Sequence, residues 1–247
     1  MAIKTTLNYS PNFSSRKRKP NQIKFIIFHY TGMKKESSAI NRLTKIQSEV
    51  SSHYFIKREG EIVTLVPELY VAWHAGKSSW KNFKSLNRNS IGIEISNPGH
   101  QFKYKKFSKK QIISLLRLSK FLIKKYKISP KNILGHSDIA PDRKKDPGEK
   151  FPWKYLAKKK VGLWHSLVAQ RLKENRMLKV TKINKKYFLN NLFKMGYSKK
   201  TPKMMNKEKY LIFVIKAFQR RYRQELISGK IDKECLLISQ NLLKKTN

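Results

Sequence analysis

The sequence predicts an α/β fold with a mixed central sheet flanked by helices, followed by a small all-α domain of three helices. Up to about residue 165, short apolar runs typical of strands alternate with longer segments of helical period. Beyond that point only helical segments follow. We therefore expect an irregular lead-in at 1–22, a first domain at 23–165, a linker at 166–183 and a helical domain at 184–247.

The strands of the first domain are predicted from short apolar or alternating runs. In the expected fourth strand, alternation places Glu94 on the face opposite Ile93 and Ile95. Gly60 lies between the second and third strands, which indicates a hairpin. The five expected strands are 24–29, 53–57, 62–66, 90–96 and 132–136.

The clearest helix is predicted at 108–126, where Ser108 and Gln111 form a capping box. A second helix is expected at 36–48, and the proline-rich segment 137–152 is expected to be a long loop. The helices of the second domain are predicted at 184–195, 208–223 and 232–244.

The chain of 247 residues is strongly basic, with 56 Lys and Arg against 15 Asp and Glu, a formal charge of +41. Such a charge favours anionic polymers. The lysines are spread over the whole chain, however, and no zinc finger, basic zipper or RNP-like motif accompanies them. Nucleic acid is therefore only an alternative partner, and the basic run 16–19 is interpreted as a solvated tail.

A single cysteine, Cys235, excludes an internal disulfide framework and a zinc site of several cysteines. No apolar stretch reaches the roughly 18 residues needed to span a membrane. The polar, basic segment 1–21 has no apolar core of a secretory signal, and Cys235 is not placed as a lipobox cysteine. We therefore predict a cytoplasmic location, with the periplasm or cell envelope as the alternative. Oligomeric state has no signature in the sequence.

Two histidines, His29 and His136, each stand at the end of a predicted strand, and Asp146 follows ten residues after the second. Pro147 biases Asp146 toward extended backbone. Two imidazoles and one carboxylate form a zinc set that leaves the fourth position for water. Without a local His-Glu-x-x-His helix, the residues alone leave ordinary surface or core histidines as the alternative.

Several short segments of the first domain combine histidines, acidic residues, glycines and aromatic residues: FHYTG at 28–32, SSHYFI at 51–56, AWHAG at 72–76, NSIGIE at 89–94, GHSDIAP at 135–141, KKDPG at 144–148 and FPW at 151–153. Taken together, in the right order over about residues 23–160, they resemble the type 2 N-acetylmuramoyl-L-alanine amidases, which include AmpD-like enzymes, phage lysozyme-type amidases and peptidoglycan recognition proteins.

The resemblance implies a zinc enzyme in which His29, His136 and Asp146 bind Zn²⁺, Glu94 is the general base and Lys144 stabilises the oxyanion. The substrate-binding residues that it implies are His74, Tyr30, Trp73 and Asn87. At 85, two residues before Asn87, many AmpD-like relatives have an arginine and this chain has a serine, so recognition of the stem peptide is expected to differ in detail.

The segments VIKAFQRRY at 214–222 and GKID at 229–232 resemble a peptidoglycan-binding domain of the small three-helix type. The whole chain thus resembles the two-domain branch of AmpD-like amidases. The alternative is a helical cap that only packs a core, so glycan binding by this domain stays open.

The expected reaction is hydrolysis of the amide between N-acetylmuramic acid, or its 1,6-anhydro form, and L-alanine of the stem peptide. It would serve peptidoglycan turnover, recycling or remodelling, and the choice between intact wall and released anhydro-muropeptide stays open. One alternative is a peptidoglycan-recognition module without activity, which the complete set of ligands with Glu94 and Lys144 disfavours. The other is a basic nucleic-acid-binding protein.

Overall fold

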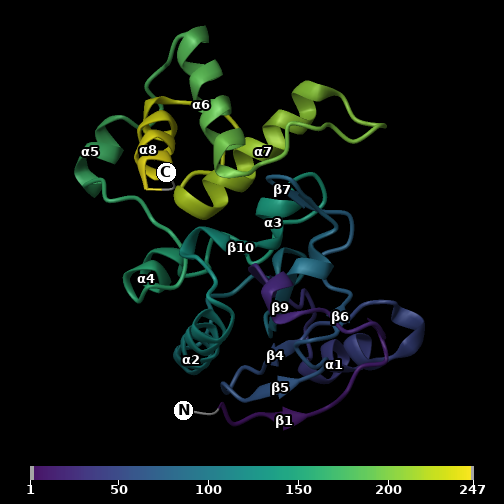
Figure 1. Ribbon diagram of the computed structural model, residues 1–247. Helices are drawn as coiled ribbons and strands as arrows, with labels where there is room; N and C mark the ends of the chain where they lie inside the picture. Colours follow the sequence, from purple (N-terminus) through teal and green to yellow (C-terminus); the bar gives the residue numbers. More distant parts are fainter. Residues whose placement is uncertain (1–2, 246–247) are drawn as a thin grey trace.

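A computed structural model describes residues 3–245 and is built around a six-stranded sheet of order β1-β5-β4-β9-β3-β10 (Figure 1). Only β4 and β5 pair antiparallel, so the sheet is mixed, as predicted. Its strands are β1 (Thr6–Leu7), β3 (Phe25–Tyr30), β4 (Tyr54–Ile56), β5 (Ile62–Thr64), β9 (Ser90–Ile95) and β10 (Ile133–Gly135). Two small antiparallel sheets pair β2 (Phe13–Ser14) with β6 (Val71–Ala72) and β7 (Ser79–Trp80) with β8 (Phe83–Lys84).

The two faces of the sheet pack against different helices. Ile26 and Phe28 of β3 lie in one core with Leu115 and Leu118 of α2 (Lys109–Tyr126). Ser108 caps this helix, because its hydroxyl accepts from the Gln111 amide at 3.1 Å while the Gln111 side chain accepts from the Ser108 amide at 2.9 Å. The predicted capping box is therefore confirmed.

On the opposite face, the β3–β10 end of the sheet packs toward the C-terminal helices α6 (Lys182–Met195), α7 (Lys207–Tyr222) and α8 (Lys233–Lys244), which gather at one end of the molecule (Figure 1). Phe25, Ile27 and Leu134 of the sheet share one core with Val214 and Phe218 of α7. The three predicted C-terminal helices are confirmed, and they form a continuous core with the sheet.

The predicted helix at 36–48 is shorter in the structure, where α1 (Glu36–Thr44) is followed by a 3-10 turn. Other short helices lie where the sequence predicts loops or linkers. Helix α5 (Ala169–Glu174) lies within the predicted linker. The predicted strand at 132–136 stops at Gly135, and His136 opens α3 (His136–Ile139) inside the expected loop. Helix α4 (Trp153–Lys158) follows that loop. The domain boundaries at 23, 166 and 184 stay predictions, and residues 1–2 and 246–247 lie outside the described part.

The described part of the lead-in is mostly without regular secondary structure, as expected, but it contains two short strands. Strand β1 extends the edge of the sheet beside β5, and β2 pairs with β6. The solvated-tail interpretation is wrong for Arg18, which is only 6% exposed. Its guanidinium donates to the carbonyls of Asn87, Arg88, Ser90 and Glu68 at 2.8–3.1 Å. Arg18 satisfies carbonyls that the turn before β9 leaves unpaired.

Arg18→Met is expected to lower the free energy of unfolding by about 3 kcal/mol or more, because several buried carbonyls lose their donor. Chemical denaturation followed by circular dichroism measures this change. Arg16→Met is the matched control, since Arg16 belongs to the same basic run but is exposed. Equal stability of the two variants would show that the Arg18 bonds contribute little.

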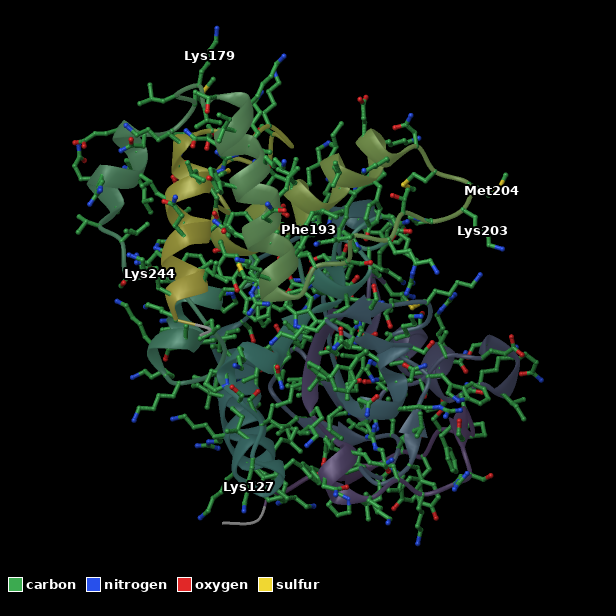
Figure 2. The ribbon with its side chains drawn as sticks, turned by 45° about the horizontal axis from the view of Figure 1, so that its top comes forward. Lys127, Lys179, Phe193, Lys203, Met204 and Lys244 are labelled. Atoms are coloured by element: carbon green, nitrogen blue, oxygen red, sulfur yellow. The ribbon has the colours of Figure 1, made fainter. Side chains whose placement is uncertain are left out.

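The positive charge is spread over the surface. Figure 2 shows Lys127, Lys179, Lys203 and Lys244 pointing outward at widely separated places. This distribution agrees with the scatter of lysines along the sequence and contrasts with a single basic stripe. Among residues 3–245, every helix is too short or too polar to cross a membrane.

Candidate metal centre and active site

Three side chains from distant parts of the chain converge at one point. His29 stands near the end of β3, His136 opens α3, and Asp146 lies in the loop that follows. The two Nδ1 atoms are 2.9 Å apart, and each lies 3.0–3.1 Å from Asp146 Oδ2. All three residues are buried, with exposed fractions of 6% or less. The structure therefore brings together the complete predicted ligand set.

The chemistry of this triangle fits a bound cation. A carboxylate only accepts hydrogen bonds, and the Nε2–H of His136 donates to the Ala75 carbonyl at 3.2 Å, which leaves the lone pair of its Nδ1 facing the triangle. Ligand atoms bonded to one Zn²⁺ at about 2.0–2.2 Å are necessarily within about 4.4 Å of one another. The separations of about 3 Å satisfy this condition.

The buried surroundings shift the pKa values of His29 and Asp146. Burial lowers the pKa of His29 to about 4, so the imidazole is neutral and its nitrogen is free to ligate. Burial acts to raise the pKa of Asp146, but His136 and His29 outweigh it and hold that pKa well below the usual range. A dication held by two imidazole nitrogens and one carboxylate would keep a net positive charge.

Glu94 lies next to the triangle because β9 pairs with β3 in parallel, with Glu94 directly opposite His29. Paired residues on neighbouring strands point to the same face, and Ile93 packs into the core on the other side, as predicted. Glu94 Oε2 is buried and has no hydrogen-bond partner among the described residues. Burial, with a smaller contribution from Asp146, raises the pKa of Glu94 to about 8.

A cleft of about 640 Å³ opens over these groups. Glu94, His136 and Asp146 line it, and so does Lys144, which is half-buried. The positive charge of Lys144 acts to lower the pKa of Glu94, which indicates that the two side chains are electrostatically coupled. Further cations on the wall are Arg42, Arg143 and Lys145.

Of the residues predicted to bind substrate, Tyr30, Trp73 and His74 lie on the cleft and Asn87 does not. Tyr30 and Trp73 line the cleft. His74 also reaches it but is 8% exposed, and both its ring nitrogens contact other protein groups. Asn87 is not among the lining residues, and its Oδ1 accepts from the amides of His74 and Ala75. A direct contact with substrate is therefore expected from Tyr30 and Trp73 and not from Asn87.

His100, which stands in none of the predicted site motifs, lines the cleft in the structure. Its Nδ1 accepts from the Tyr30 hydroxyl at 2.8 Å, and its Nε2 donates to Glu149 at 3.0 Å. These contacts orient Tyr30 toward the wall of the cleft. No local motif could have shown this, because the three residues are far apart in the chain.

Comparisons with known proteins agree with this geometry. The sequence profile of the N-acetylmuramoyl-L-alanine amidase family matches residues 19–149. The N-acetylmuramoyl-L-alanine amidase AmiD of Escherichia coli is 38% identical over 238 residues, which is 91% of this chain and 83% of the relative. The chain belongs to the type 2 N-acetylmuramoyl-L-alanine amidases.

Two other relatives place this member within the family. The 1,6-anhydro-N-acetylmuramyl-L-alanine amidase AmpD of Haemophilus influenzae is 32% identical over 60% of this chain and 88% of its own length. The structure of E. coli AmiD with anhydro-N-acetylmuramic acid-L-Ala-D-γ-Glu-L-Lys superposes with a TM-score of 0.79, at 37% identity, over 91% of this chain and 90% of that one. AmpDh3 of Pseudomonas aeruginosa with an anhydromuramic pentapeptide gives 0.78 at 29% identity, over 94% of both chains. The predicted AmpD-like family and fold are confirmed, including the C-terminal helices.

Proposed function

We propose that this chain is a zinc-dependent amidase that hydrolyses the bond between the lactyl group of N-acetylmuramic acid and L-alanine of a stem peptide. The observation that carries the proposal is the triangle of His29, His136 and Asp146 beside Glu94, whose buried Oε2 has no hydrogen-bond partner among the described residues. A recognition module without activity has no need of a buried carboxylate next to such a triangle, since that burial is unfavourable.

Zn²⁺ fits the site better than Mg²⁺ or Ca²⁺, because two of the three donor atoms are imidazole nitrogens. His29 and His136 would ligate through Nδ1 and Asp146 through Oδ2. When bound, the ion supplies a Lewis acid that lowers the pKa of a water to about 7 and polarises a carbonyl.

Glu94 would accept a proton from the attacking water, whose oxygen bonds to the lactyl carbonyl carbon. The Lys144 ammonium would stabilise the negative charge that develops on the carbonyl oxygen. As the C–N bond breaks, Glu94 returns the proton to the leaving nitrogen. The products are a lactyl carboxylate and a peptide with a free L-alanine amine, so one water is consumed for each bond.

The substrate class follows from the cleft and from the relatives. The AmiD and AmpDh3 structures hold anhydromuramic peptides. The cations Arg42 and Lys145 on the cleft wall suit the free carboxylates of such a stem peptide. We propose a muropeptide as substrate, with anhydro-muropeptide and intact wall both to be assayed. The cytoplasmic location stays a prediction.

Mass spectrometry of anhydro-muropeptide and of purified sacculi incubated with the protein tests the proposal. We expect a peptide that begins with L-alanine and a muramic acid product that together exceed the substrate mass by one water. A chelator should abolish product formation, and added Zn²⁺ should restore it. Cleavage at another bond, or activity unaffected by metal removal, would contradict the proposal. Binding of wall fragments without turnover would favour a recognition module, and salt-dependent DNA binding without turnover would favour the nucleic-acid alternative.

A further inference from the structure

One short segment, His74–Ala75, contacts both histidines of the metal triangle on the side away from the triangle. His29 Nε2 lies 3.0 Å from His74 Nδ1. His136 Nε2 lies 3.2 Å from the Ala75 carbonyl oxygen. Each ligand imidazole therefore faces the triangle with Nδ1 and this segment with Nε2.

The directions of these bonds are fixed by a chain of groups that starts at the Leu86 carbonyl, which only accepts. The Ser90 hydroxyl donates to it at 2.6 Å. The Ser90 oxygen then accepts from His74 Nε2 at 3.1 Å, so the proton of the neutral His74 ring is on Nε2. His74 Nδ1 consequently accepts from His29 Nε2–H, and the lone pair of His29 Nδ1 is left facing the metal site.

The segment itself is firmly held. Asn87 Oδ1 accepts from the backbone amides of His74 at 3.1 Å and Ala75 at 2.7 Å. Gly92 of β9 lies beneath the imidazole, and a Cβ at that position would overlap the His74 ring. The Ala75 carbonyl also accepts from Arg143 at 2.5 Å. The ring and the backbone of the segment are thus both fixed in place.

We propose that His74 and Ser90 are positioning residues that hold His29 in the tautomer required to bind zinc, with Asn87 fixing the segment that carries His74. Partners of this kind fix the ring orientation of ligand histidines and raise their basicity. Both nitrogens of His74 are already engaged in this network, so the ring has no polar atom left for substrate. The proposal rests on the proposed zinc function.

The test measures zinc affinity of the full chain by competition with a chromophoric chelator, in the unaltered protein and in His74→Phe. Phenylalanine keeps the ring but removes the acceptor of His29 Nε2–H, so we expect affinity to fall about 10–100-fold. Ser90→Ala should also weaken binding, and Ser90→Thr, which keeps the hydroxyl, should restore it. His100→Phe is the matched control, because His100 lines the same cleft and contacts no ligand, and its affinity should be unchanged.

A second readout, also independent of activity, is the position of the proton on the His74 ring. In the zinc-loaded protein, ¹⁵N chemical shifts should show the proton of His74 on Nε2, and the thermal melt of each metal-free variant shows whether it is folded. If folded His74→Phe binds zinc as tightly as the unaltered chain, or if the His74 proton is on Nδ1, the positioning role is wrong. If the unaltered chain itself fails to bind zinc, the proposed function fails instead.

Discussion

Glu94→Gln is expected to lower kcat/KM on anhydro-muropeptide by about 10²–10⁴-fold while zinc still binds. Glutamine has the shape of glutamate but cannot take a proton from the attacking water. Glu94 is not one of the three residues of the metal triangle, so the ligands stay in place. Steady-state kinetics give the loss of turnover, and metal analysis of the purified variant gives the zinc content.

The matched control is Glu59→Gln, which removes a carboxylate that is exposed and paired with Lys110. Its turnover should equal that of the unaltered chain. If Glu94→Gln retained full activity, Glu94 would not be the general base. If it lost zinc together with activity, Glu94 would belong to the metal site.

The same substitution is expected to stabilise the metal-free protein near pH 8, although it abolishes most of the turnover. Burial raises the pKa of Glu94 from about 4.5 to about 8. Between these two pH values, Glu94 is therefore protonated in the folded chain and ionised in the unfolded chain. The contribution of Glu94 to stability is therefore full below pH 4.5 and declines as pH rises, by at most about 1.4 kcal/mol per pH unit, until the folded group ionises near pH 8. In excess chelator, Glu94→Gln should melt at a higher temperature than the unaltered chain at pH 8, and the difference should shrink toward pH 5.

Much of the fold is readable from the sequence because long periodic segments determine it. The strand at β9 and the helix at α2 have strong patterns, and the capping box at Ser108 marks where that helix begins. Strand β1 has two residues, too few to show a period. Helix α3 has four, and Pro141 and Pro147 nearby made its segment resemble a loop. The missed elements are those that tertiary contacts stabilise.

In the candidate site too, the residues in sequence motifs could be predicted and those that act through distant contacts could not. The metal triangle and Glu94 could be named in advance because each stands in a segment that resembles the motifs of the amidase family. The role of His74 could not, because it depends on Ser90 and His29, which are 16 and 45 residues away. Arg18 looked like one cation in an exposed run, and only the folded chain shows the carbonyls that surround it. Contacts between distant polar groups leave no local pattern.

Arg221→Met is expected to lower the free energy of unfolding by about 3–5 kcal/mol, because it removes one partner of a buried ion pair. Arg221 of α7 is 2% exposed, and its guanidinium donates to Asp138 Oδ2 at 2.6 Å and to the Ile133 carbonyl at 2.9 Å. Methionine fills similar volume but leaves the Asp138 carboxylate buried without a counter-charge. Thermal melting should show a decrease in Tm of about 10 °C.

The consequence extends to the metal site, because Asp138 Oδ2 also accepts from the Gly135 amide, one residue before His136. The C-terminal helices thereby hold the turn that carries His136, and Tyr197 adds a bond to Asp138 Oδ1 at 2.8 Å. Adding Asp138→Asn to Arg221→Met removes the unpaired charge and should recover part of the lost stability. Arg171→Met, at an exposed position of α5, is the control and should change little. A normal melt for Arg221→Met would show that the helices pack against the sheet without depending on this ion pair.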